Sequence, residues 1–270
     1  MSTQSDSPPD HEPPSPADDG NARPADATLH ATLASWVPTA TRATAFRHGL
    51  MAAISVPGCV LMTTSLGFGA LARDAELFLA QALFLAAVLY ALPAQVILVD
   101  QISRDATLWM AAFAVSLTAI RLLPMTVTLV PYFRGDPGGL WLKVLAVHFV
   151  AVTAWVESRK WLPTLPPDLR LPFFLGLGFG FLGVTLTGTA AGYALAGSVS
   201  PAIVAALLLS TPIYFLLSLL GSMKDRADGV AIALGAVGGP LFHSVTPQLD
   251  LMCAGLVGGT AAWLVFGRRR

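Results

Sequence analysis

Long apolar segments, separated by short polar breaks, follow one another from residue 50 to residue 266. Each segment is apolar throughout, whereas strands of a membrane barrel alternate polar and apolar positions, so the pattern predicts helices. A helix needs about 20 residues to cross the apolar core of a bilayer. Eight segments are of roughly this length: 50–72, 77–99, 106–133, 140–161, 171–195, 203–220, 230–245 and 249–266. The chain is therefore predicted to be all-α, a polytopic transmembrane helix bundle of about eight spans.

Composition and charge support this class and suggest an orientation. Only 12% of the residues are charged and 54% are hydrophobic, whereas soluble domains carry about 25% charged residues. Eight spans put both termini on one side, and that side collects twelve of the sixteen Lys and Arg residues, Arg42 and Arg104 among them. The other side receives Arg73, Arg134 and Lys143. Because Lys and Arg accumulate on the cytoplasmic side, both termini are predicted to be cytoplasmic.

The segment 230–245 is the least certain span, because it is short and contains Gly235, Gly238, Gly239 and Pro240. A re-entrant segment here would put the C-terminal arginines on the opposite side, so eight crossings are retained.

Three regions are predicted along the chain. Residues 1–45 hold six of the sixteen acidic residues and seven of the twenty prolines. Such a composition cannot bury enough apolar surface to fold alone, which predicts a disordered cytoplasmic tail, with a regulatory or partner-binding arm as the alternative. It also lacks the basic start and apolar core of a signal peptide. Residues 46–267 form the transmembrane domain, and 268–270 form a cytoplasmic Arg tail.

Arg121 is the only charged residue between positions 106 and 133. Insertion of such a charge at the bilayer centre costs about 2.5–3.5 kcal/mol, so intramembrane charges mark functional sites by default. Its planar fork could bind a solute carboxylate through two hydrogen bonds. The alternatives are structural: the guanidinium could pair with backbone carbonyls freed near Pro93 or Pro124, or with Asp100.

Helix breakers and polar side chains within the segments supply further candidates. Backbone groups freed by Pro or Gly in a membrane need partners in the protein or in a water-filled cavity, and transporters use such sites to bind solutes. The alternative for the glycines is close helix packing, as in Gly176-xxx-Gly180 and Gly188-xxx-Gly192, and for histidine a bridge between helices. The predicted substrate-binding residues are Arg121, Gln95, Pro93, Gly67, Gly69, His148, Thr187 and Thr189.

Motifs of membrane enzymes and ATPases do not occur in the sequence. It has no Gly-x-Ser-Gly, no His-Glu-x-x-His and no P-loop, so it is predicted not to be an enzyme. Cys59 and Cys253 have no second thiol or His cluster at ligand spacing, so neither a metal nor a cofactor is expected.

Several short motifs, taken in order, resemble those of a known family. They are Phe46-Arg-His-Gly49, Pro57, Phe68-Gly-Ala-Leu-Ala72, Ala91-Leu-Pro-Ala-Gln95, Thr118-Ala-Ile-Arg121, Val130-Pro131 and Thr187-Gly-Thr-Ala-Ala-Gly192. This series resembles the AzlC family of branched-chain amino acid permeases, the large component of bacterial two-component exporters. The chain departs from the family pattern at Ala119, where Asn is usual, at Leu122, where His is usual, and at Leu92-Pro93, where Gly precedes the Gln motif.

The resemblance implies a multi-pass permease in the bacterial cytoplasmic (inner) membrane that exports branched-chain amino acids with a small hydrophobic AzlD-like subunit. In this interpretation Arg121 holds the carboxylate, Gln95 offers a polar contact, and glycines of the first and fifth spans permit rocking. The alternative is a non-transporting structural or sensory subunit in which Arg121 only pins helices together.

Overall fold

The computed structural model describes residues 37, 40–120, 122–198, 200–222, 226–245 and 250–266. Arg121, nearly all of the predicted tail before Arg42, and the predicted Arg tail at 268–270 lie outside these residues. Residues 41–270 form one compact unit, to which the following description applies.

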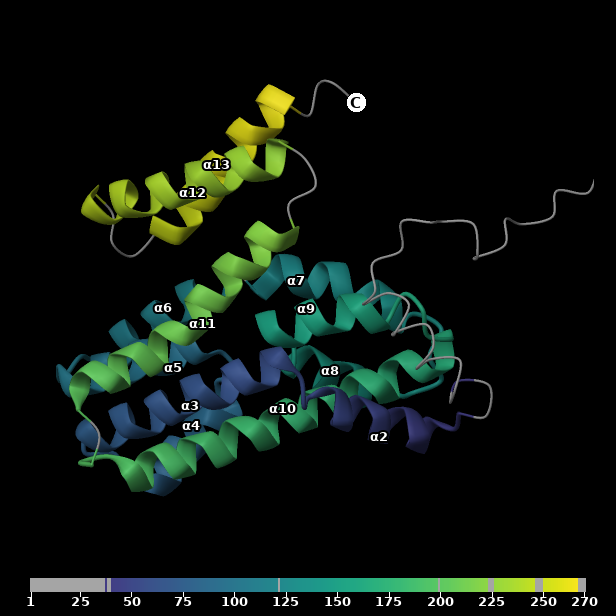
Figure 1. Cartoon of the computed structure of the whole chain (residues 1–270), viewed down its shortest axis with the longest axis horizontal. Coiled ribbons are helices and arrows are strands. Elements are labelled where there is room, and N and C mark those ends of the chain that lie inside the picture. Colours follow the sequence, from purple (N-terminus) through teal and green to yellow (C-terminus); the bar gives the residue numbers. More distant parts are fainter. Residues whose placement is uncertain are drawn as a thin grey trace, which may run out of the picture. The chain divides into compact units, whose positions relative to one another are not determined.

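The described residues contain α-helices and one 3₁₀ helix, η2, and no strand, which confirms the all-α prediction (Figure 1). The helices are α2 (Arg42–Ala52), α3 (Val56–Asp74), α4 (Leu79–Val88), α5 (Leu92–Ser103), α6 (Leu108–Ala119), α7 (Leu122–Leu129), η2 (Val130–Phe133), α8 (Leu140–His148), α9 (Val152–Trp161), α10 (Pro167–Leu195), α11 (Pro201–Ser222), α12 (Arg226–Val245) and α13 (Asp250–Phe266).

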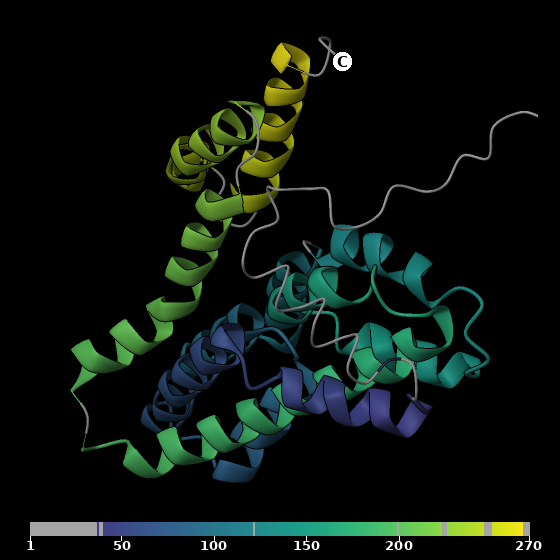
Figure 2. The ribbon, with the colours of Figure 1, turned by 45° about the vertical axis from the view of Figure 1, so that its right-hand side comes forward.

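Helix α10 packs closely along α2 and α3, and Figures 1 and 2 show α2 beside it. The close approach depends on glycine. A Cβ atom added at Gly176 would lie 2.0 Å from the Phe46 carbonyl oxygen, and one at Gly192 would lie 2.0 Å from that of Leu66. Gly180 and Gly188 likewise face α2 and α3 at short range. These four glycines therefore serve helix packing, the alternative considered for them from the sequence.

Each of the first four apolar segments is broken into two helices. Breaks lie at 53–55, 89–91 and 149–151, and between the end of α6 at Ala119 and the start of α7 at Leu122. Three of them precede a proline: Pro57 and Pro93 fall in the first two positions of α3 and α5, and Pro124 is the third residue of α7. Proline has no N–H to donate to the carbonyl four residues before it, and its ring clashes with that carbonyl, so proline is tolerated in the first turn of a helix but not inside it, which explains these breaks. The break at 149–151 contains no proline or glycine.

The second segment, 77–99, folds back on itself as two helices. Val99, near the end of α5, packs in one buried cluster with Leu77 and Ala82, which lie at the start of α4. Ile102 borders the same surface pocket as Leu77 and Ala80. The helix pair α4–α5 is therefore a hairpin and not one continuous helix, so the prediction that this segment spans the membrane is not confirmed. The end of the hairpin opposite its turn holds the start of α4 and the end of α5. It lies at the C-terminal end of α10, where the Tyr193 hydroxyl donates to the Leu77 carbonyl at 2.8 Å.

The fourth segment, 140–161, is also a hairpin. The start of α8 and the end of α9 lie at the N-terminal end of α10. Trp161, at the end of α9, stacks on Phe173 with ring centroids 5.5 Å apart. A Cβ at Gly138, just before α8, would lie 2.9 Å from a Leu171 methyl group. Phe149, at the tip, contacts Gly178 farther along α10. The predicted crossing is again not confirmed, and Figure 1 shows the two hairpins beside opposite halves of α10.

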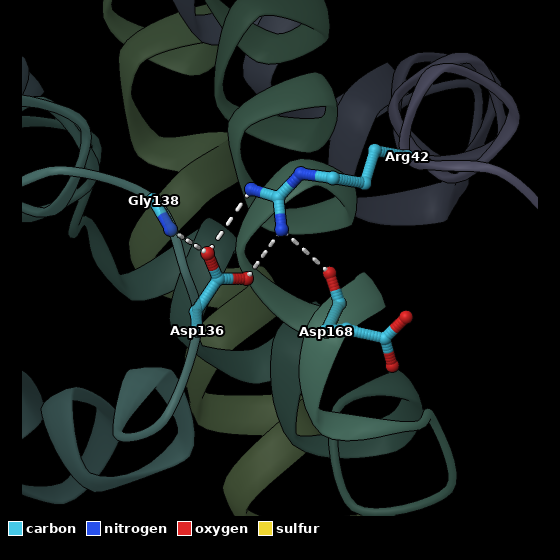
Figure 3. Close-up of polar contacts among 4 residues, drawn as sticks. All are labelled: Arg42, Asp136, Gly138 and Asp168. Carbon is cyan, nitrogen blue, oxygen red and sulfur yellow. Dashed lines mark hydrogen bonds and ion pairs between the residues drawn. The ribbon is translucent and has the colours of Figure 1, made fainter.

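An ion pair joins three segments at the N-terminal end of α10. The guanidinium of Arg42 contacts the carboxylate of Asp136 at 3.0 Å and donates to the backbone carbonyl of Asp168 at 3.0 Å (Figure 3). The eight-span layout would place Arg42 and Asp136 on opposite sides of the membrane. With two hairpins in place of two crossings, they share one side.

The hairpins also change the distribution of basic residues. The α10 N-terminal end now gathers Arg42, Arg134, Lys143, Arg159, Lys160 and Arg170. The opposite end holds Arg73 and Arg104. Arg134, Lys143 and Arg104 have changed sides relative to the sequence prediction, and the asymmetry between the ends remains strong. By the positive-inside rule, the α10 N-terminal end is the one expected in the cytoplasm.

Among the described helices, α10 is long and apolar enough by itself to cross a membrane. The bent pairs α2–α3, with an angle of 59°, and α6 with α7–η2, with an angle of 47°, meet the same criterion as pairs. Helices α12 and α13 pack against each other in opposite directions, with Gly238 near Ala254 and Gly258 near Leu234.

Candidate functional site

A cavity of about 400 Å³ lies where the helix breaks meet. The α4–α5 break contributes Tyr90 and Ala91, the α8–α9 break contributes Ala151, and α7 contributes its first residue, Leu122. The other lining residues come from α3, α5, α9, α10 and α11: Leu61, Leu92, Pro93, Gln95, Val96, Ile97, Val152, Thr153, Thr185, Leu208, Leu209, Thr211 and Pro212. The cavity is therefore built from both hairpin tips and from helices that pack around them.

Three helices begin at this cavity, because the breaks lie inside the apolar segments. The first residues of α5, α7 and α9, which are Leu92, Leu122 and Val152, all line it. A helix start leaves backbone N–H groups without intrahelical acceptors and carries a partial positive charge. The residues before α5 and α9 are Ala91 and Ala151, whose side chains cannot cap these groups. Such an arrangement favours an anionic group, for example a carboxylate.

The start of α9 offers more free donors than the start of α5. In α5, Pro93 has no N–H, and the N–H groups of Ala94 and Gln95 donate to the Ala91 carbonyl. In α9, the first intrahelical bond runs from Trp155 to Ala151 at 2.8 Å. The N–H groups of Val152, Thr153 and Ala154 have no backbone acceptor within the described part of the chain. The start of α9 therefore presents three backbone N–H groups without a backbone acceptor among the described residues.

Gln95, on the α4–α5 hairpin, carries a buried side-chain acceptor. Its side chain is buried, with 2% exposure, and Nε2 donates to the Leu89 carbonyl at 2.7 Å. Because a carbonyl can only accept, this bond fixes the amide orientation and leaves Oε1 as an acceptor. Oε1 has no hydrogen-bond partner among the described residues. A buried acceptor without a partner costs about 1–3 kcal/mol, so this atom needs an explanation.

Most of the remaining wall is apolar, and its polar members are hydroxyls. Thr185 of α10 donates to the Phe181 carbonyl at 2.9 Å. Thr211 of α11 lies 2.5 Å from the hydroxyl of Thr64, which also contacts Ser210 at 2.9 Å. None of the lining residues named above carries a formal charge at neutral pH. The cavity thus combines a mostly apolar wall with threonine hydroxyls and the backbone N–H groups at the start of α9.

The structure distributes the predicted site residues over three environments. Pro93 and Gln95 line the cavity. Gly67 and Gly69 face neighbouring helices, where added Cβ atoms would lie 3.0 Å from the Leu208 side chain and 2.1 Å from the Thr189 carbonyl.

The other polar candidates lie away from the cavity lining. His148 is exposed at the end of α8, and its Nε2 lies 3.0 Å from the Ala87 carbonyl of α4, a bridge between the two hairpins. Thr187 is exposed and donates to the Gly183 carbonyl at 2.8 Å. Thr189 is fully buried, and its hydroxyl has no partner among the described residues. Arg121 lies outside the described residues, and its neighbour Leu122 lines the cavity.

The α9 start, Thr153, Thr185 and Thr211 are not among the site residues predicted from the sequence. Thr211 stands beside Pro212, and Thr185 lies in a Gly- and Thr-rich segment, so both had a weak sequence signal. Residues 149–152 are Phe, Val, Ala and Val. Such a run gives no sign of a helix start, which is why this part of the site was missed.

Residues 57–199, more than half of the chain, match the family model described as "AzlC protein". This stretch contains both hairpins and most of the cavity lining. No curated protein and no solved structure matches the chain.

Proposed function

Because the chain belongs to the AzlC family, whose function is membrane transport related to branched-chain amino acid export, we propose that it exports small amino acids, chiefly branched-chain ones, from the cytoplasm. In this proposal it is a multi-pass protein of the bacterial cytoplasmic membrane and works with a small hydrophobic AzlD-like subunit. It acts as a carrier and catalyses no chemical step.

The cavity at the meeting of the helix breaks is the observation that carries the proposal. Solute sites of carriers commonly lie at discontinuous helices, where freed backbone groups meet the solute. A volume of about 400 Å³ lies at the small end of the range of about 300–1,000 Å³ for ligand pockets, which suits a single small solute. The apolar wall, with Leu92, Val96 and Leu208, suits an aliphatic side chain.

The two hairpins suggest how such a solute could move. They enter from opposite ends of α10, and their tips border the same cavity. Displacement of the α8–α9 hairpin would open the cavity toward the α10 N-terminal end, and displacement of the α4–α5 hairpin would open it toward the other end. Carriers built in this manner expose a fixed site to each side in turn.

Efflux of leucine and valine from cells loaded with a leucyl-valine dipeptide tests the proposal. The AzlD-like subunit is expressed together with wild-type protein, Leu209→Trp or Ile203→Trp. Leu209 and Ile203 both lie on α11 and are similarly exposed, at 54% and 53%, but only Leu209 lines the cavity. We expect Leu209→Trp to abolish efflux and Ile203→Trp to retain it, at equal membrane abundance.

Two outcomes contradict the proposal. Absence of efflux from the wild type would favour the non-transporting subunit. Equal efflux from both variants would mean that the solute does not pass through this cavity.

A further inference from the structure

A second pocket, of about 180 Å³, lies between α9 and the end of the third apolar segment. Helix α9 lines it with residues three or four positions apart, which share one helix face: Trp155, Ser158, Arg159 and Leu162. The remaining lining residues come from α7 and η2 and are Thr128, Leu129 and Tyr132. This pocket shares no lining residue with the cavity at the hairpin tips, so it is a separate site.

The walls of the pocket are fixed by contacts between α7 and α9, which are neighbours in the bundle (Figure 1). The indole N–H of Trp155 donates to the Thr128 hydroxyl at 2.9 Å, and that hydroxyl donates to the Met125 carbonyl at 2.8 Å. The Ser158 hydroxyl donates to the Ala154 carbonyl. Because these hydroxyls already have partners, the group that is left to bind a ligand is the guanidinium of Arg159.

The Arg159 guanidinium carries a positive charge that no acidic side chain in the described part of the chain neutralises. It lies over the Trp155 ring, 4.9 Å from the ring centroid, and takes part in none of the ion pairs there. The neighbouring carboxylate of Glu157 binds Lys160 at 2.7 Å and Trp161 at 3.1 Å instead. Since a contact with a ring face does not use the N–H groups, the guanidinium remains available for an anion such as phosphate.

The pocket lies at the end of the molecule where the basic residues gather. The Arg170 guanidinium, in the first turn of α10, lies 5.6 Å from the centroid of the Tyr132 ring. Phe133, the next residue, contacts Phe174 of α10 with ring centroids 5.2 Å apart. The positive-inside rule puts this end in the cytoplasm, and Trp and Tyr are enriched where a membrane meets water. The pocket is therefore expected among the headgroups of the cytoplasmic leaflet.

An apolar stripe on α7 connects the pocket to deeper parts of the membrane. Leu123, Val127 and Val130 recur every three or four residues and are 65%, 63% and 40% exposed. The stripe begins beside the pocket-lining residues of α7 and runs back to the start of this helix, which borders the main cavity. A soluble anion would use the pocket alone, whereas the acyl chains of a lipid would also cover the stripe.

We propose that this pocket binds the phosphate headgroup of an anionic phospholipid of the cytoplasmic leaflet, with Arg159 in contact with the phosphate and the acyl chains along α7. Basic pockets between membrane helices on the cytoplasmic side are suited to such headgroups. A zwitterionic lipid also has a phosphate, but its cation would be repelled by Arg159 and Arg170. The proposal does not depend on the identity of the transported solute.

Native mass spectrometry of the full-length protein in an uncharged detergent tests the ligand. The protein is titrated with dioleoyl phosphatidylglycerol, with dioleoyl phosphatidylcholine and with glycerophosphoglycerol, which is the anionic headgroup without acyl chains. Hydrogen bonds to a charged group correspond to roughly tenfold or more in affinity, so we expect phosphatidylglycerol to bind at least about tenfold more tightly than either alternative. Equal affinity for the two lipids would overturn the proposal. Equal affinity for glycerophosphoglycerol would replace the lipid by a soluble phosphate compound.

Arg159→Gln tests the residue, with Arg134→Gln as the matched control. Arg134 is exposed at the same end and does not line the pocket. Each variant removes one positive charge, so general attraction of the membrane surface would change by roughly fivefold in both. We expect Arg159→Gln to lose the preference for phosphatidylglycerol over phosphatidylcholine and Arg134→Gln to retain most of it. The same preference in both variants would show that the attraction is diffuse and that the pocket is not a lipid site.

Discussion

The guanidinium of Arg42 donates two hydrogen bonds, of 3.0 and 3.2 Å, to the carboxylate of Asp136, although the two residues are 94 positions apart. The Asp136 side chain is fully buried, whereas that of Arg42 is 40% exposed. Asp136 Oδ1 also accepts from the Gly138 N–H at 2.6 Å. The pair therefore fastens the start of α2 to the turn between η2 and α8, beside the first turn of α10.

Arg42→Ala is expected to destabilise this end of the bundle. The substitution leaves the buried Asp136 carboxylate with the Gly138 N–H as its remaining partner, and loss of hydrogen bonds to a charged group costs about 1.5–3 kcal/mol. Thermal unfolding in detergent measures the effect as a lowered Tm. Arg47→Ala, at an exposed position of the same helix, is the control. Equal Tm values for the two variants would show that the pair does not contribute.

Cysteine accessibility should distinguish the hairpin topology from eight crossings. In a background with Cys59 and Cys253 replaced by Ala, single cysteines are placed at the exposed positions Arg104, Gly139 and Thr164. Two hairpins put 139 and 164 on one side and 104 on the other. We expect an impermeant thiol reagent added from one side to label 139 and 164 together. Eight crossings would instead pair 104 with 164.

Glycine packing on α10 predicts a contrast between two substitutions in one helix. In Gly192→Ala the new methyl group would lie 2.0 Å from the Leu66 carbonyl oxygen, and such overpacking costs about 1–3 kcal/mol. Gly183 has no atom within 4 Å of the corresponding position, so Gly183→Ala should be neutral or stabilise by up to about 1 kcal/mol through helix propensity. Thermal unfolding of the two variants and of the wild type measures this difference in stability as a difference in Tm. A Gly192→Ala protein as stable as wild type would contradict the close α3–α10 contact.

Arg121→Lys is expected to abolish leucine efflux while membrane abundance stays at the wild-type level. Lysine keeps the charge but lacks the planar fork that binds a carboxylate bidentately. Efflux and immunoblotting of the membrane fraction are measured together. A variant that loses abundance in proportion to efflux would indicate that Arg121 pins helices and does not contact the solute.

The sequence alone determined the helical class and part of the site. Continuous apolar segments require backbone groups to be paired within each segment, which only helices achieve locally. Pro57 and Pro93 marked two of the breaks, because proline cannot donate to the carbonyl four residues before it and therefore favours the first turn of a helix. Gln95 stood out as a polar side chain beside such a break. The spacing of Gly188 and Gly192 likewise suggested a helix contact.

Tertiary structure alone decided which segments double back and what their tips enclose. An apolar segment such as 77–99 has the same length and composition whether it crosses or returns, and Val99 reaches Leu77 only through packing among α3, α4 and α5. At 149–151 no residue disfavours a helix, and the chain turns where Phe149 packs on Gly178 of α10. The start of α9, and with it the donors at Val152 and Thr153, results from contacts between residues distant in sequence. The local sequence determines which side chains and helix breaks each segment contains. The direction that the chain takes after a break depends on the surfaces against which it packs.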